Sequence, residues 1–302
     1  MSEREPSDDG ATTALRRRLA ERRASLEQRR RLGLLAAVLA RFKDIDGGTQ
    51  ATVLSVALFT TILPLIIIGF AFLSGFAADV SVGVLFDREV GLSGSAAETV
   101  RQAFGSAEGV RSSWTFIGIA GFLLAGIPMA VTVAGIFAKA WMRDELNFGQ
   151  RLWRGVVWFL LYLATLAVHD SIAFGDDHSF AVGLLLFVVS LLPLWLFWTA
   201  TPVLLVRNGA RGARFLAVAG LAGVVVNGIV MAGALRLVFP PMLAGWTGFG
   251  PIGVAMAIVT WCGIVAIGWV ATACLGAVLW ERSAPEDTVI EAESSDAVEV
   301  VS

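Results

Sequence analysis

Residues 180–206 read FAVGLLLFVVSLLPLWLFWTATPVLLV, a stretch without a single charged side chain. A helix needs about 20 consecutive apolar residues to cross the hydrocarbon core of a bilayer. Five other stretches are almost as free of charge, so the sequence predicts an all-α polytopic membrane protein with six transmembrane helices. The predicted spans are residues 51–76, 114–138, 153–174, 180–206, 215–238 and 251–280, and together they form one transmembrane domain, 51–280.

The composition agrees with a membrane protein and excludes a soluble globular enzyme. The chain is 56% hydrophobic and 16% charged, whereas soluble domains average about 45–50% apolar and about 25% charged residues. Cys262 and Cys274 share the last predicted span. They would lie about 18 Å apart along a helix, so they cannot form a disulfide with each other.

The distribution of Lys and Arg predicts the orientation. Of the 23 basic residues, all but four lie before the first span, around the second and fourth loops, or after the last span. Because Lys and Arg concentrate in cytoplasmic segments, we expect both termini in the cytoplasm. The excess of Arg over Lys is typical of a GC-rich bacterial genome, and helical spans exclude an outer-membrane barrel. We therefore expect a multi-pass protein of the bacterial inner (plasma) membrane.

Residues 1–50 are predicted to be cytoplasmic and basic. Residues 12–31 have a basic helical pattern, and residues 32–42 are apolar but too short to span. Together they favour an amphipathic helix that lies on the membrane surface before the first span. A solvated helix without lipid contact is the alternative, and nucleic acid is not an expected partner because acidic residues are interleaved and no aromatic stacking platform is present. The expected contacts to lipid headgroups are Arg16, Arg17, Arg18, Arg22 and Arg23.

Two other segments are predicted to lie outside the membrane. Residues 281–302 are acidic and lack apolar periodicity, which predicts a disordered cytoplasmic tail. Residues 77–113 form the one sizeable outer loop, in which Ser95 and Glu98 have the spacing of a capping box. The loop is expected to contain a short helix on the outer bilayer surface, with docking of a partner as the alternative.

A polar cluster ends the third predicted span. The uncharged run 155–168 amounts to about 21 Å of helix and is too short to cross the core, so His169 and Asp170 must help to span. With residues 176–178, this stretch contains both histidines of the chain and three carboxylates. Neighbouring residues project about 100° apart on a helix, which favours contact with a proton or polar substrate over a shared metal. A polar helix end without chemistry is the alternative.

Prolines interrupt three predicted spans, at Pro64, Pro128, Pro193 and Pro202. Each frees a backbone carbonyl and kinks its helix, and a membrane tolerates this only where protein or cavity water pairs the freed group. Kinked spans that line a central cavity and simple packing both account for this pattern. Asn227 is read as an interhelical hydrogen bond or a cavity contact. The candidate cavity or substrate contacts are Pro64, Pro128, His169, Asp170 and Asn227.

Three stretches resemble the YihY/BrkB family of membrane proteins. Residues 41–69 (RFKDIDGGTQATVLSVALFTTILPLIIIG) are similar to the first span of the family, with Pro64 in its hydrophobic-Pro-Leu run. Residues 114–154 resemble the second span and its basic loop. Residues 248–282 resemble the closing glycine-containing segment, with Phe249 in place of the usual tyrosine.

This resemblance implies an envelope-integrity protein, and some members are suspected of moving lipids or solutes. We expect permease-like or lipid- or solute-translocating activity through a cavity in the helical bundle, with membrane lipids and a small solute or lipid as partners. The alternative is a non-transporting scaffold for envelope proteins or lipids. A ribonuclease label attached to the family finds no support, because the chain has no soluble domain. Nucleotide-binding and hydrolase motifs are absent, so no enzyme, cofactor or metal is expected.

Overall fold

The computed structural model describes residues 33–73, 114–173, 180–207, 213–286 and 288–289. Within these ranges every regular element is a helix, as predicted, and none is a strand. The longer elements are α2 (Leu34–Asp44), α3 (Gly47–Leu73), α6 (Trp114–Ala140), α7 (Phe148–Ala173), α8 (Phe180–Leu205) and α12 (Pro251–Ser283). Between α8 and α12 lie α9 (Ala213–Gly223), the π-helix η2 (Val224–Met231), α10 (Ala232–Leu237), α11 (Phe239–Trp246) and the 3-10 turn η3 (Thr247–Phe249).

Four helical stretches of this described part are long and apolar enough to cross a membrane. They are Phe148–His169, Ala181–Leu205, Arg214–Trp246 and Ile252–Ser283. The helices α3 and α6, of 27 residues each, occupy the two remaining predicted ranges. These four helices agree with the predicted class, an all-helical membrane protein. The count of six spans stays a prediction.

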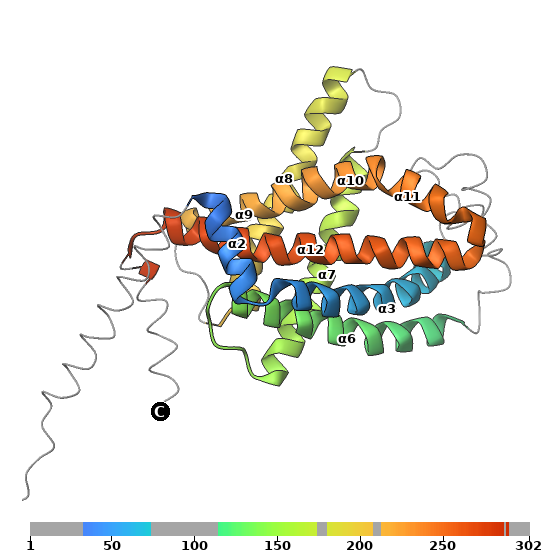
Figure 1. Cartoon of the computed structure of the whole chain (residues 1–302), viewed down its shortest axis with the longest axis horizontal. Coiled ribbons are helices and arrows are strands. Elements are labelled where there is room, and N and C mark those ends of the chain that lie inside the picture. Colours follow the sequence, from blue (N-terminus) through green and yellow to red (C-terminus); the bar gives the residue numbers. More distant parts are fainter. Residues whose placement is uncertain (1–32, 74–113, 174–179, 208–212, 287, 290–302) are drawn as a thin grey trace, which may run out of the picture.

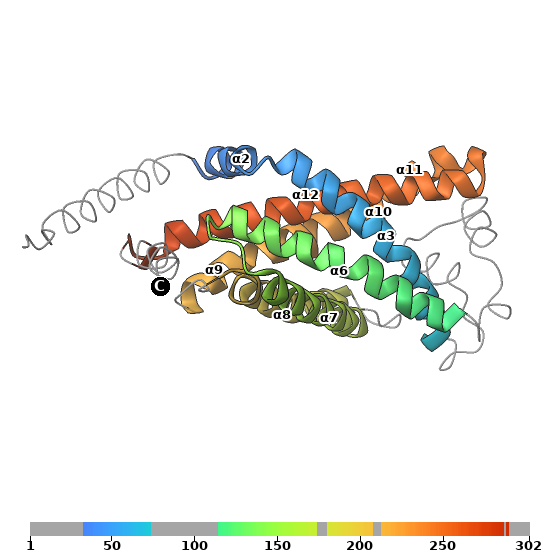
Figure 2. The same ribbon diagram turned by 90° about the horizontal axis from the view of Figure 1, so that it is seen from below.

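Most of the helices form one layer, and one pair of helices runs across it. In Figure 1, α3, α6 and α12 extend along the long axis of the molecule, with α9 to α11 beside α12. The helices α7 and α8 pair with each other and run steeply across this layer. Figure 2 shows the α7–α8 pair on one face of the layer, next to α6 and α9.

Local sequence signals set the ends of several helices. The side chain of Asn147 caps α7, because its Oδ1 accepts the backbone N–H of Gln150 at 2.9 Å, which pairs one of the free donors of the first turn. Gly250 enters α12 with φ of 59°, a conformation that glycine adopts without strain. Pro251 follows at the first helical position, where its missing N–H has no cost.

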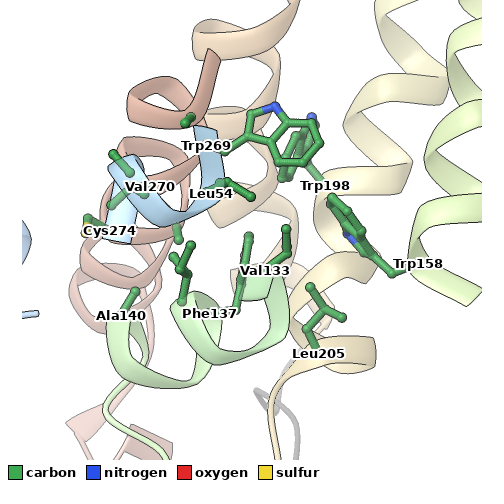
Figure 3. Close-up of a cluster of buried hydrophobic side chains, with 14 of the residues drawn as sticks. Leu54, Val133, Phe137, Ala140, Trp158, Trp198, Leu205, Trp269, Val270 and Cys274 are labelled. Carbon is green, nitrogen blue, oxygen red and sulfur yellow. The ribbon is translucent and has the colours of Figure 1, made fainter. Parts of the chain in front are cut away.

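A cluster of aromatic rings joins the α7–α8 pair to the layer. Trp158 of α7 is fully buried and packs edge-on against Trp269 of α12 with ring centroids 5.3 Å apart. The ring centroid of Trp198 in α8 lies 6.4 Å from that of Trp158. The Tyr162 ring stacks on Trp158 with centroids 5.7 Å apart. Figure 3 shows Trp158, Trp198 and Trp269 converging beside Leu54 of α3. Edge-to-face ring pairs of this kind add specificity to the apolar burial.

Glycines let the helices of the two sets approach each other. A Cβ on Gly155 of α7 would lie 2.8 Å from the carbonyl oxygen of Ala130 in α6, and a Cβ on Gly223 of α9 would overlap the indole ring of Trp198. Small residues at such contacts allow close packing of helices in membranes, where burial of apolar surface from water does not drive association.

The first residues of the predicted tail, 281–302, belong to α12. The helix continues to Ser283, and Glu281 is only 6% exposed. Val289 beyond it is fully buried. The helix extends because Glu281 has a buried partner in α2, which no local pattern shows. Residues 290–302, the basic stretch 12–31 and the outer loop 77–113 lie outside the described residues.

The contact between Gly223 and Trp198 predicts a position-specific loss of stability. Replacement Gly223→Ala should lower the free energy of unfolding by about 1–3 kcal/mol, the usual cost of overpacking. The control is Gly233→Ala in α10, where an added Cβ meets no atom within 4 Å and higher helix propensity contributes up to about 1 kcal/mol. SDS-induced unfolding in mixed micelles measures both variants. Equal stability of the two variants would contradict this packing.

Candidate functional site at the ends of α2, α6 and α12

A buried arginine connects three helix ends. Arg41 of α2 is 4% exposed, and its Nη2 donates to both carboxylate oxygens of Glu281 in α12, at 2.7 and 2.9 Å. Its Nη1 donates to the carbonyl oxygen of Ala140, the last residue of α6, at 2.5 Å. A bidentate pair between a guanidinium and a carboxylate is among the strongest hydrogen-bonded arrangements in proteins. We call these three residues the Arg41 clamp.

The carbonyl group of Ala140 is free for Arg41 because of how α6 ends. The N–H of Arg143 donates to the carbonyl oxygen of Ala138 at 2.9 Å, and the N–H of Met142 to that of Lys139 at 3.0 Å. These two bonds form a Schellman motif, which places Met142 at the left-handed position usually held by glycine, and its φ is 53°. The motif leaves the carbonyl of Ala140 without a backbone partner, at the negative end of the helix dipole, where a cation is stabilising.

Two aromatic residues are sequence neighbours of clamp residues and pack against each other. Trp141, which follows α6, and Trp280, which precedes Glu281, are buried, with ring centroids 5.4 Å apart. The guanidinium carbon of Arg143 lies 5.9 Å from the centre of the Trp280 ring, within the range of a cation–π interaction. Arg41 and Glu281 are themselves buried, at 4% and 6% exposed, which strengthens their electrostatic attraction.

A cavity of about 560 Å³ opens beside the clamp. Its wall comes from α2, the turn between α2 and α3, the first turn of α3 and the end of α6. The lining residues are Arg41, Asp44, Ile45, Asp46, Gln50, Lys139 and Met142.

The predicted contacts lie elsewhere and make separate interhelical bonds. The Nδ1–H of His169 donates to the carbonyl oxygen of Ser190 in α8, at 2.9 Å. Asn227 lies in η2, and its Nδ2 donates to Thr272 Oγ1 of α12 at 3.1 Å. This bond corresponds to the first of its two predicted roles, an interhelical hydrogen bond. Asp170 lies in the last turn of α7, and its side chain is outside the described part.

Of the two predicted prolines, Pro64 lies where α3 meets α6. Pro64 of α3 faces Gly121 of α6, where a Cβ would lie 3.2 Å from its ring. One turn before Pro64, Thr61 is buried, and its hydroxyl donates to the carbonyl oxygen of Ala125, at 3.1 Å. Ala125 lies one residue after Leu124, whose carbonyl loses its backbone donor because Pro128 has no N–H. Pro128 itself is exposed.

None of the five predicted contacts lines the cavity beside the clamp. The headgroup contacts predicted from Arg16 to Arg23 and the polar residues 176–178 lie outside the described residues. No group of three or more His, Cys, Asp or Glu side chains in the described ranges is arranged to hold a metal ion.

Sequence reasoning missed the clamp for a clear reason. Arg41 and Glu281 are 240 positions apart, and both fall outside the predicted spans, where a charged residue is ordinary. The available signal was Arg41 itself, which closes the apolar run 32–42 on the face of α2 that buries Ala37 one turn earlier.

Comparison of the chain with protein-family models, with curated proteins and with solved structures finds no match.

The clamp predicts a large effect of removing one charge. Replacement Glu281→Gln leaves the Arg41 guanidinium buried without its counter-charge, which should lower the free energy of unfolding by about 3–5 kcal/mol. The control is Glu145→Gln. The partner of Glu145 is Arg151, both side chains are partly exposed, and exposed pairs of this kind contribute about 0–1 kcal/mol.

SDS-induced unfolding in mixed micelles measures both variants. The double variant Arg41→Met/Glu281→Leu should recover part of the loss, because it removes both buried charges together. Similar stabilities for Glu281→Gln and Glu145→Gln would contradict a structural clamp.

Proposed function

We propose that this chain is an integral protein of the bacterial inner membrane that supports the cell envelope by moving a lipid or polar solute between the helices of its bundle. In this proposal all six predicted ranges span the membrane, with α7 and α8 turned toward the direction of the other helices, and both termini are cytoplasmic. The resemblance of residues 41–69, 114–154 and 248–282 to YihY/BrkB proteins supports the same assignment.

The outer surface of the helices supports a place in the bilayer. On α8, Leu185, Leu192 and Leu196 are each more than half exposed, and the helix contains no charged residue. Contiguous apolar surface of this kind is not stable in water. In a bilayer the same side chains contact lipid chains, which are equally apolar.

The observation that carries the transport proposal is a set of irregular helical turns, each held by one side chain of a neighbouring helix. Ser190 precedes Pro193 by three residues, and its carbonyl accepts the His169 bond. Ala125 precedes Pro128 by three residues, and its carbonyl accepts the Thr61 bond. A proline frees the carbonyl four residues before it, so each of these bonds lies one residue from the freed group, in the same turn. Transporters place broken helices at their binding sites.

The π-helix η2 adds a third irregular turn. A π-helical segment in a longer helix often marks a functional position, and Asn227 joins it to Thr272 of α12. The Thr272 hydroxyl in turn donates to the carbonyl oxygen of Gly268 at 2.8 Å. Single hydrogen bonds between membrane helices contribute about 0.6 kcal/mol on average. Bonds of this strength can break and re-form as helices move, which suits a protein that alternates between two conformations.

A scaffold is the second candidate, and one observation favours it. The stretches of α7 and α8 that could span a membrane are the least buried of the four. This pair presents Leu161, Val168 and Leu184 outward, so a large apolar surface is open to lipids or to other membrane proteins.

Removal of the interhelical hydrogen bonds at the irregular turns tests whether the protein transports a substrate or acts as a scaffold. Replacements His169→Ala and Asn227→Ala each remove one interhelical bond of about 0.6 kcal/mol, which would shift an equilibrium between two conformations about threefold. We expect rates of lipid or dye flux in reconstituted vesicles to change by about this factor, with protein abundance unchanged.

The control is Thr260→Ala, because the Thr260 hydroxyl bonds only within its own helix, to Met256 at 2.8 Å. The same variants are scored in a deletion strain for dye leakage and antimicrobial sensitivity. If both variants restore the strain fully and the flux is that of the control, the scaffold is the better reading.

Thiol labelling tests the topology. Cys262 and Cys274 are buried, so the background is low. Replacements Ser2→Cys and Ser302→Cys should react with a membrane-impermeant reagent only after spheroplasts are permeabilised, whereas Ser93→Cys should react in intact spheroplasts. Labelling of Ser302→Cys in intact spheroplasts would place the C-terminus outside the cytoplasm and contradict the topology.

A further inference from the structure

The cavity beside the Arg41 clamp holds charged side chains that pair with none of the described residues. Asp44, Asp46 and Lys139 line it, and all three side chains are exposed. Within the described residues they take part in no hydrogen bond or ion pair. Arg41 also lines the cavity, but its guanidinium is paired with Glu281 and with the carbonyl of Ala140. The unpaired groups are therefore two carboxylates and one ammonium.

This charge pattern selects a class of ligand. A ligand with one cationic and one anionic group would place its cation at the carboxylates and its anion at Lys139, forming charge-assisted hydrogen bonds at both ends. A purely anionic ligand would meet two carboxylates and one lysine, so like charges would oppose it.

Two backbone outliers stand on different walls of the cavity. Asp46, in the turn between α2 and α3, and Met142, after α6, both have φ of 53°, a left-handed conformation that costs free energy for residues other than glycine. At Met142 this conformation belongs to the Schellman motif that ends α6, so it shapes the wall of the cavity and is not by itself a sign of a ligand. The cavity volume of about 560 Å³ lies within the range of small-ligand sites, about 300–1,000 Å³.

The position of the cavity matches the headgroup level of a membrane. It lies where α6 ends and next to the end of α12, which the distribution of Lys and Arg assigns to the cytoplasmic surface. The helix α2 beside it presents Leu35 and Leu39 outward, 79% and 68% exposed, with Lys43 in its last turn. An apolar face with a basic end is typical of a helix lying in the bilayer interface.

We propose that this cavity binds the headgroup of an ethanolamine phospholipid, with the ammonium at Asp44 and Asp46 and the phosphate at Lys139. The proposal rests on the membrane placement of the proposed function and names the lipid class that the protein recognises. A primary ammonium donates hydrogen bonds to carboxylates, whereas a choline group cannot and prefers aromatic rings. The cavity wall contains no aromatic side chain.

Native mass spectrometry of the full-length protein tests the site with phosphatidylethanolamine, phosphatidylglycerol and phosphatidylcholine of identical acyl chains. We expect tightest binding of phosphatidylethanolamine. Lys139→Gln should weaken this binding about tenfold, the effect of one charge-assisted hydrogen bond. Asp44→Asn/Asp46→Asn should abolish the preference over phosphatidylglycerol.

The control variant is Lys43→Gln, which removes a positive charge from α2 but does not line the cavity. It should bind like the wild type. Unfolding midpoints of all variants should agree, since the replaced side chains are exposed and unpaired, and asparagine at position 46 tolerates the left-handed backbone.

Equal or tighter binding of phosphatidylglycerol by the wild type would overturn the proposal, as would unchanged binding in the cavity variants. Equally tight binding of the free headgroup, glycerophosphoethanolamine, would overturn the assignment to a lipid. The assay measures no flux, so a protein that binds the lipid selectively and moves none would refute transport and leave this site standing.

Discussion

The bonds of Arg41 to Glu281 and Ala140 are the constraint on which this end of the molecule depends. A guanidinium that is 4% exposed must have its charge and its donors paired, and here a carboxylate and a helix-terminal carbonyl supply both. The requirement fixes where α2 lies against α6 and α12. It also extends α12 beyond Trp280, because Glu281 must remain helical to reach Arg41.

The middle of the bundle is held by different means. Aromatic rings of α7, α8 and α12 meet at Trp158, and a few side chains bond the turns that prolines and the π-helix disturb. His169, Thr61 and Asn227 each serve one such turn. Apolar contact and single hydrogen bonds allow more relative movement than a buried ion pair does. The structure thus combines an end joined by a buried ion pair with a middle joined by ring contacts and single hydrogen bonds.

This division bears on function. The charged side chains that could contact a ligand lie at the cavity beside the clamp. The polar residues in the middle of the bundle form hydrogen bonds between helices instead. In our proposals, selectivity for a lipid headgroup belongs to the end of the bundle, and passage of lipid or solute belongs to the irregular turns. The two proposed activities depend on different side chains, so mutations can test them separately.

The sequence by itself determined the helices, because length, apolar composition and end signals such as Asn147 and Gly250-Pro251 act over a few neighbouring residues. It also identified Asn227 as a polar residue that needs a partner inside a span. Only the tertiary structure decided the partners, which are Glu281 for Arg41 and the Ser190 carbonyl for His169. It also decided that α7 and α8 run steeply across the layer. Partner choice depends on how helices pack, and packing is a property of surfaces brought together from distant parts of the chain.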